Sequence, residues 1–211
     1  MKLPFRIALI LGAHTDDEFG CAGTIARMVE EDVEVHCVTF SRCEDSVPSG
    51  FPEDILEHEW RQATAHLGIP AKNLRLFSYR VRHFPQFRQD ILELLVVICE
   101  QIQPDVVFLP ASTDIHQDHS VITVEGMRAF KHSTILGYEL PQNTITFQHA
   151  CFISLQERHL QAKIDSLMLY KSQAFRNYRS DDFLRGLARV RGVQINTTYA
   201  EAFEILRWVL R

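Results

Sequence analysis

Apolar residues fall into two kinds of segment that alternate along the first half of the chain. Short continuous runs, such as residues 6–11 (RIALIL) and 106–109 (VVFL), are typical of strands buried on both faces of a sheet. Between them, apolar positions spaced as on one face of a helix recur, first at Ala22, Ile25, Ala26 and Val29. The same reasoning predicts further strands over residues 33–40 and 74–79, and further helices over 56–67 and 89–103.

Strands that alternate with helices of this length predict an α/β fold with a Rossmann-like, mostly parallel sheet and helices on both faces. No repeat, low-complexity tract or Gly/Ser linker divides the sequence, so residues 1–211 are expected to form a single domain. The last third is less regular. It predicts a helix around residues 160–167 and another over 181–191, and leaves 134–138 and 202–206 open as strands or short helices.

Composition narrows the classes of function. The chain has 22 Lys and Arg against 27 Asp and Glu, a net charge of −5, and so lacks the basic excess expected of a nucleic-acid-binding protein. Its apolar runs fall far short of the roughly 20 residues that span a bilayer, and the N-terminal run is too short for a signal peptide. The five cysteines include no CxxC pair, which fits reduced thiols. We therefore expect a cytoplasmic protein with no nucleic-acid partner and no membrane span.

Charged side chains gather where two of the predicted strands end. His14, Asp16, Asp17 and Glu18 follow the first strand directly, and residues 113–119 (TDIHQDH) follow the strand at 106–109. Ligands of α/β proteins bind beyond the carboxyl ends of the strands, so the two clusters are expected to face each other across one crevice. Like charges this close raise one another's pKa unless a cation neutralises them, which predicts a metal site. For the first cluster alone, the alternative is that its acids only cap the following helix.

A catalytic zinc site uses three His or carboxylate ligands and leaves the fourth position for water. His14, one of the two aspartates, and either His116 or His119 supply such a set. Asp16 and Asp17 are adjacent in a turn, so one can bind the metal while the other acts as general base towards the water. Spacing alone does not decide which aspartate has which role.

The two clusters resemble the signatures AHPDDE and HxDH of the PIG-L/LmbE-like family of zinc-dependent N-deacetylases, here residues 13–18 (AHTDDE) and 116–119 (HQDH). Weaker resemblances follow along the chain: residues 41–44 (SRCE) to the family's (S/T)RGE loop, 59–68 to its E…A…LG helix, 103–107 (QPDVV) to its PDVV strand, and 199–203 (YAEAF) to its YAEAF ending. The resemblance implies an LmbE-like fold and a hydrolase that removes an N-acetyl group from an amino sugar or a sugar-containing small molecule.

Carried over position by position, the resemblance makes His14, Asp17 and His119 the ligands of a Zn²⁺ ion, with Fe²⁺ or another divalent metal as an alternative. It makes Asp16 the general base. It makes a protonated His116 the group that stabilises the oxyanion or protonates the leaving amine.

The resemblance also implies residues around this centre. Asp118 is expected behind one of the two histidines of its own signature, where it fixes the ring tautomer. Arg42 and Glu44 fall in the (S/T)RGE loop, and Glu44 is implied to contact sugar hydroxyls. Arg80 and Arg82 stand where many family members have an aspartate-containing stretch; two arginines there suit a phosphate or carboxylate on the substrate, the alternative being that both are solvated surface charges.

Two further departures from the family pattern are Thr15 in place of a proline and Cys43 in place of a glycine. Two rival functions also stay open. One is a sugar- or nucleotide-binding module without catalysis, although neither GxGxxG nor GxxxxGK[ST] follows the first strand and a free carboxylate beside the ligands argues for hydrolysis. The other is a metal-dependent amidase that acts on a non-sugar amide. A homo-oligomer is left open as well.

Overall fold

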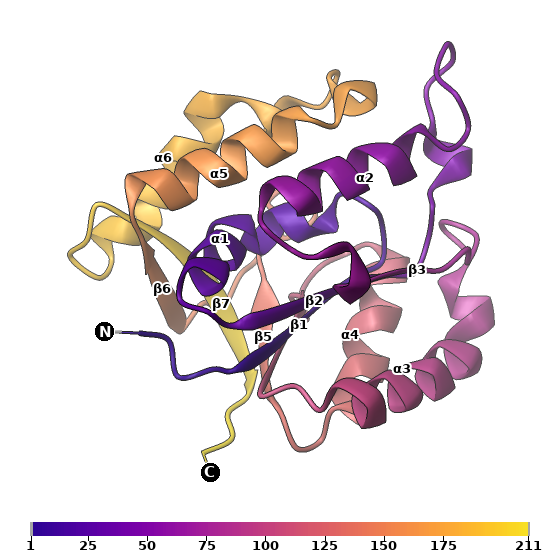
Figure 1. Ribbon diagram of the computed structural model, residues 1–211, viewed down its shortest axis with the longest axis horizontal. Helices are drawn as coiled ribbons and strands as arrows, with labels where there is room; N and C mark the ends of the chain where they lie inside the picture. Colours follow the sequence, from indigo (N-terminus) through magenta and orange to yellow (C-terminus); the bar gives the residue numbers. More distant parts are fainter. Residues whose placement is uncertain (1, 211) are drawn as a thin grey trace.

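Seven strands form one mixed sheet in the computed structural model, which describes residues 2–210 (Figure 1). In chain order they are β1 (Ile7–Gly12), β2 (Glu34–Thr39), β3 (Leu74–Leu76), β4 (Val106–Pro110), β5 (Thr134–Tyr138), β6 (Cys151–Leu155) and β7 (Tyr199–Arg207). Their order across the sheet is β3-β2-β1-β4-β5-β7-β6. Neighbours from β3 to β5 pair in parallel, whereas β7 runs antiparallel to both β5 and β6. The predicted α/β class with a mostly parallel sheet is confirmed.

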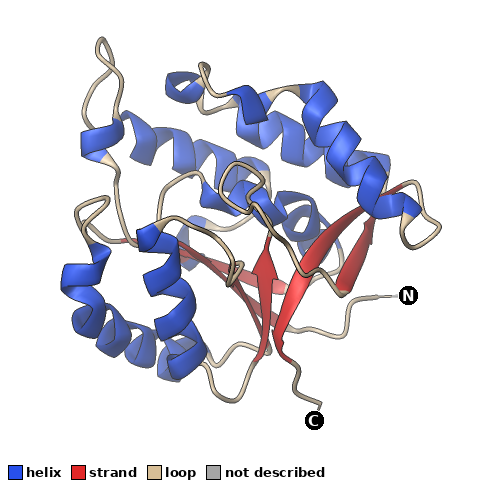
Figure 2. Cartoon of the chain, turned by 180° about the vertical axis from the view of Figure 1, so that it is seen from behind, coloured by secondary structure: helices blue, strands red, loops and turns tan. Residues whose placement is uncertain are grey.

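Helices cover both faces of the sheet (Figure 1; Figure 2). On one face lie α1 (Ala22–Glu30), α2 (Ile55–His66), α5 (Glu157–Met168) and α6 (Asp181–Val193); on the other lie α3 (Arg88–Ile102) and α4 (Gln117–Ala129). Within the described part of the chain, no helix is both long enough and apolar enough to cross a membrane.

The central strand β1 is a continuous run of apolar residues because helices cover both of its faces. Ala8 and Ile10 are buried in the apolar cluster beneath α1 and α2, while Leu9 and Leu11 are buried in the cluster beneath α3 and α4. Successive side chains of a strand point to opposite faces, so a strand covered on both sides has no position left for a polar residue.

Most predicted elements agree with the structure. Helices predicted at 56–67 and 89–103 lie within one residue of α2 and α3, and the open segments 134–138 and 202–206 are both strands. The strand predicted over 74–79 is shorter, because regular pairing with β2 ends at Leu76. The backbone amides of Phe77 and Tyr79 still bond the carbonyl oxygens of Thr39 and Phe40, so the segment stays extended beside β2.

The topology places the two charged clusters side by side. β1 pairs with β2 on one side and with β4 on the other, and the chain order of the strands reverses at this point. Ligands of open α/β sheets bind at such a switch point, beyond the carboxyl ends of the strands. The loops after β1 and β4 therefore open into one crevice.

Candidate functional site

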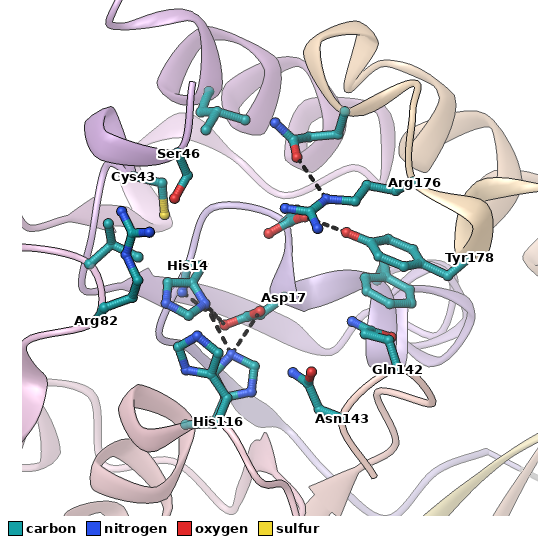
Figure 3. A pocket seen from close by; sticks show the side chains of 16 residues that line it. His14, Asp17, Cys43, Ser46, Arg82, His116, Gln142, Asn143, Arg176 and Tyr178 are labelled. Carbon is teal, nitrogen blue, oxygen red and sulfur yellow. Dashed lines mark hydrogen bonds and ion pairs between the residues drawn. The ribbon is translucent and has the colours of Figure 1, made fainter. Parts of the chain in front are cut away.

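A pocket of about 280 Å³ lies at this switch point (Figure 3). The segments that follow β1 and β4, including the first turn of α4, supply five of its lining side chains, namely His14, Asp16, Asp17, His116 and His119. The two clusters that lie about a hundred residues apart in the sequence thus meet, as their positions at neighbouring strand ends predict.

Three metal-binding groups, two imidazoles and one carboxylate, converge at the floor of the pocket. His14 Nδ1 lies 3.0 Å from His119 Nε2, His119 Nε2 lies 3.3 Å from Asp17 Oδ1, and His14 Nδ1 lies 3.6 Å from Asp17 Oδ2. Ligands bound to one zinc ion at about 2.0–2.2 Å in a tetrahedron are about 3.3 Å from one another. The spacing of these three groups therefore fits a single small divalent ion.

Carboxylates on the far side of both rings fix where the ring protons are. His14 Nε2 bonds Asp118 Oδ2 at 3.1 Å, and His119 Nδ1 bonds Asp114 Oδ2 at 2.7 Å. An ionised carboxylate only accepts, so each ring carries its proton on the outer nitrogen. When both rings are neutral, their inner nitrogens present lone pairs to each other and to Asp17, an arrangement that a cation between them stabilises.

These contacts correct the expected position of Asp118. It lies behind His14, not behind a histidine of its own signature, and Asp114 occupies the place behind His119. The reason is geometric: Asp118 lies in the first turn of α4, and its carboxylate points back towards β1 while also accepting the backbone N–H of Arg82 and of Phe84.

The electrostatics of the floor favour bound positive charge. Burial alone would raise the pKa of Asp17, yet the neighbouring His119 and His14 hold it well below its usual value. Burial alone would lower the pKa of His119, yet Asp17 and Asp114 raise it to about 10. The same field that binds a proton there also attracts a metal ion.

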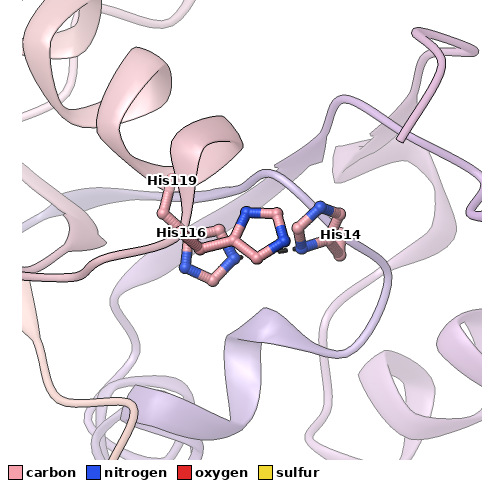
Figure 4. A group of neighbouring side chains, drawn as sticks. All are labelled: His14, His116 and His119. Atoms are coloured by element: carbon pink, nitrogen blue, oxygen red, sulfur yellow. Dashed lines mark hydrogen bonds between the residues drawn. The ribbon is translucent and has the colours of Figure 1, made fainter. Parts of the chain in front are cut away.

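His116 lies beside the other two histidines (Figure 4), and one ligand atom from each of the three lies within 4.8 Å of the others. Its Nδ1 accepts the backbone N–H of Asp118 at 3.2 Å, which closes the first turn of α4. Burial and the neighbouring His14 and His119 lower the pKa of His116 to about 4. These neighbours favour a neutral ring, and because Nδ1 accepts the Asp118 N–H its proton lies on Nε2. The imidazolium expected for His116 stays a prediction.

Asp16 lines the same pocket as the three converging groups but makes its hydrogen bond to a different residue. Its Oδ2 accepts a hydrogen bond from the Tyr178 hydroxyl at 3.1 Å, and the Tyr178 ring stacks on Phe19. Burial and the charge of Asp17 raise the pKa of Asp16, which brings this carboxylate closer to the range of a general base.

The loop that carries these residues is tightly closed. Asp17 Oδ2 accepts the backbone N–H of His14 at 2.8 Å, and a Cβ at Gly12 would lie 3.0 Å from the His14 carbonyl oxygen. Glycine at this position lets the chain turn sharply out of β1. The Tyr170 hydroxyl contacts both the Thr15 carbonyl and Glu18 from the other side of the loop.

The far wall of the pocket, across from Arg82, was not predicted as a substrate-binding surface. It is lined by Gln142 and Asn143 from the β5–β6 loop, and by Gln173, Arg176 and Tyr178 from the connection between α5 and α6 (Figure 3). Polar residues in long connections are common, and nothing in their local pattern distinguishes residues that face a pocket from residues that face solvent.

Three arginines and one glutamate were proposed to bind substrate, and they differ in whether they line the pocket. Arg82 lines the pocket, whereas Arg42, Glu44 and Arg80 are not among its lining residues. Arg42 pairs with Glu57 at 3.5 Å, and Arg80 pairs with Asp45 at 2.8 Å.

A family model described as PIG-L, GlcNAc-PI de-N-acetylase, matches residues 9–130, which include both charged clusters of the pocket floor. The chain belongs to the PIG-L family. An uncharacterized deacetylase of Escherichia coli, YaiS, is 31% identical over 171 residues, which cover 78% of this chain and 90% of YaiS. The membership of this family, predicted from the two signatures, is thereby confirmed.

Solved structures of PIG-L-like fold agree with the architecture. N,N'-diacetylchitobiose deacetylase from Pyrococcus horikoshii is 21% identical, with a TM-score of 0.79 over 96% of this chain and 84% of the archaeal one. A 4-carboxy-2-hydroxymuconate hydratase from Pseudomonas putida is 19% identical, with a TM-score of 0.78 over 100% of this chain and 98% of the hydratase. At these identities the likeness concerns the fold, and the reaction has to be argued from the site.

Proposed function

We propose that this PIG-L family protein is a metal-dependent hydrolase that removes an N-acetyl group from an amino sugar or a sugar-containing small molecule. The observation that carries the proposal is the convergence of three electron-rich donors, His14 Nδ1, His119 Nε2 and the Asp17 carboxylate, beside a second carboxylate that no ligand role requires. The relative YaiS, a deacetylase by name and 31% identical, supports the choice of bond.

His14, Asp17 and His119 would hold the metal, Zn²⁺ in our proposal, with Fe²⁺ as the alternative that the same ligand types allow. When bound, the metal polarises the amide carbonyl and lowers the pKa of a water molecule towards about 7. Asp114 and Asp118 keep the two imidazoles in the tautomer that leaves their inner nitrogens free to bind.

Asp16 acts as the general base and accepts the proton of the attacking water. Its raised pKa suits this role, and the hydroxyl of Tyr178 holds the carboxylate in one orientation. The same proton can then pass from Asp16 to the nitrogen of the departing amine, which cannot leave as an unprotonated anion.

His116 stabilises the negative oxygen that develops on the amide carbon. Because its Nδ1 is occupied by the Asp118 backbone N–H, its Nε2–H is the group available to donate into the pocket. A neutral donor of this kind needs no protonation step and stays competent across neutral pH.

The amide side chains of the far wall can form hydrogen bonds with a sugar. Gln142, Asn143 and Gln173 offer both donors and acceptors to hydroxyl groups. Arg42 and Glu44 of the (S/T)RGE loop stay proposed substrate contacts. The five cysteines are all free, which supports the cytoplasm as the proposed compartment.

Acetate release tests the proposal. The metal-loaded protein would be given a panel of N-acetylated amino sugars and, in parallel, non-sugar acetamides, with the free amine identified by mass spectrometry. Release from at least one sugar, lost in Asp16→Asn and kept in the surface control Asp54→Asn, is the expected result. Release only from non-sugar amides would favour the amidase, and binding without release in every case would favour the non-catalytic module.

A further inference from the structure

Two arginines of one loop differ in what they contact. Arg80 Nε donates to the carboxylate of Asp45 at 2.8 Å, which balances its charge within the protein. Arg82, two residues later, reaches the same residue only at its backbone carbonyl, with NH2 at 3.2 Å from Asp45 O. Among residues 2–210, no carboxylate lies within 4.0 Å of the Arg82 guanidinium.

The backbone at Arg82 is held firmly in place. Its N–H donates to Asp118 Oδ2, the same oxygen that bonds His14 Nε2 at 3.1 Å. Its φ of 70° is left-handed, and the flanking Val81 and Phe84 are buried. A side chain other than glycine in this conformation costs about 1–2 kcal/mol, so the loop fixes Arg82 against a local preference.

The pocket puts this cation opposite the catalytic side. Arg82 lies with Cys43 and Ser46 on one wall, and Arg176 and Tyr178 lie across from it (Figure 3). Arg176 sits beside Asp16, whose negative charge it partly balances. Both guanidiniums keep most of their five donors open, and Asp45 partly balances Arg82 in the same way. Arg82 is the one on the wall away from Asp16, so an anion bound there would not face that carboxylate.

We propose that the substrate carries an anionic group, a phosphate or a carboxylate, and that Arg82 binds it. This inference rests on the proposed function for the amino-sugar part of the ligand. A guanidinium grips such groups through two parallel hydrogen bonds, and a neutral sugar would leave its charge unmatched. In a chain of net charge −5, a pocket arginine that forms no close ion pair, and whose charge Asp45 balances only at longer range, favours an acidic ligand.

Equilibrium binding of deacetylated amino sugars tests the inference without depending on turnover. Glucosamine, glucosamine 1-phosphate, glucosamine 6-phosphate and muramic acid would be titrated into the metal-loaded protein by calorimetry. At least one acidic sugar should bind about tenfold to a hundredfold more tightly than glucosamine, the range expected for charge-assisted hydrogen bonds.

Three variants test whether Arg82 causes the preference for acidic sugars. Arg82→Asn removes the guanidinium and suits the left-handed backbone, so the fold should persist; it should abolish the preference. Arg82→Lys keeps the charge and should retain part of it. Arg80→Met removes a charge from the same loop outside the pocket and should leave the preference intact.

Several results would overturn the inference. One is equal binding of acidic and neutral sugars by the wild type, or no binding of any. Another is a preference that survives in Arg82→Asn, since the anion would then be bound by another group of the pocket, the metal or Arg176. A third is a preference lost equally in Arg80→Met, which would indicate a general electrostatic field. Failure of acetate release with an Arg82-dependent preference intact would instead count against the deacetylase reaction alone.

Discussion

The floor and the far wall of the pocket are built in different ways. The floor comes from the short segments that follow β1 and β4, including the first turn of α4, and its side chains hold one another through the contacts of Asp17, Asp114 and Asp118. The wall comes from the β5–β6 loop and the α5–α6 connection, and distant elements hold it. Glu59 of α2, for example, bonds both the backbone N–H and the hydroxyl of Ser172.

In the proposed function, the floor binds the metal and carries out the reaction, whereas the far wall binds the substrate. A metal centre tolerates little variation in ligand type or distance, so it is encoded in contiguous motifs on rigid strand ends. Substrate contacts tolerate variation, and the connections that supply them can change without disturbing the sheet. Changes in the floor should therefore remove metal binding or turnover, whereas changes in the wall should alter substrate affinity and leave the metal in place.

Metal removal should have the largest effect. Treatment with a chelator should reduce acetate release by about a thousandfold or more, since the metal contributes several kcal/mol to charge stabilisation. The far-UV circular dichroism spectrum should stay the same, because the floor loops are tied to the sheet by bonds that do not involve the ion, such as Asp17 Oδ2 with the His14 amide. Full turnover by the metal-free protein would contradict this picture, and reloading with Zn²⁺ or Fe²⁺ would identify the productive metal.

Asp114→Asn should weaken metal binding at the floor without removing any of the proposed metal ligands. The asparagine oxygen can still accept the His116 amide, but its NH₂ group can no longer accept the proton of His119 Nδ1. The His119 proton should then move to Nε2, the nitrogen that binds the metal, and metal affinity should fall by about 10- to 100-fold. Competition with a chromogenic chelator would measure this affinity, with Asp54→Asn as the control; unchanged affinity would mean that Asp114 does not set the tautomer.

Glu59→Ala should disturb the far wall of the pocket and leave the floor intact. The Ser172 amide would lose its partner in a buried place, which costs about 1–3 kcal/mol and loosens the segment that carries Gln173 and Tyr178. KM should rise more than kcat falls, metal content should stay the same, and Glu59→Gln should restore most of the affinity. Loss of metal in Glu59→Ala would show that floor and wall are not independent.

Cys43→Gly should have the smallest effect. Cys43 holds a left-handed φ of 60°, which glycine adopts without strain, but the variant also loses a buried side chain. The two effects offset each other, so the free energy of unfolding in urea should change by less than about 1 kcal/mol. Burial raises the pKa of the Cys43 thiol to about 12, so no thiolate is lost and kcat should stay the same. A large fall in kcat would assign Cys43 a chemical role that the account lacks.

How far the sequence predicts the molecule follows from how local each feature is. The buried strand β1 and the helical spacing of α1 depend on neighbouring residues and were predicted. α4 was missed, because its first turn is the polar HQDH motif and His116 serves as its N-cap. β6 was missed because three of its five side chains are only partly buried, which weakens the apolar pattern.

The site shows the same limit. The five pocket-floor residues could be singled out from their positions at strand ends, and the family resemblance supplied roles for them. The partner of each imidazole could not be predicted, since whether Asp114 or Asp118 lies behind His119 depends on how α4 is rotated against β1. The far wall depends on tertiary contacts such as that of Glu59 with Ser172, which no local pattern encodes.

The two adjacent aspartates provide the most direct test of the proposed mechanism. Metal content and acetate release would be measured together for Asp16→Asn and Asp17→Asn, two substitutions that hardly change side-chain volume. Asp16→Asn should keep the metal and lose about 10²- to 10⁴-fold in kcat, the usual effect of removing a general base. Asp17→Asn should lose metal affinity, and added Zn²⁺ should restore part of its activity. Metal loss in Asp16→Asn with metal retention in Asp17→Asn would reverse the two roles, and normal turnover in both variants would contradict the account.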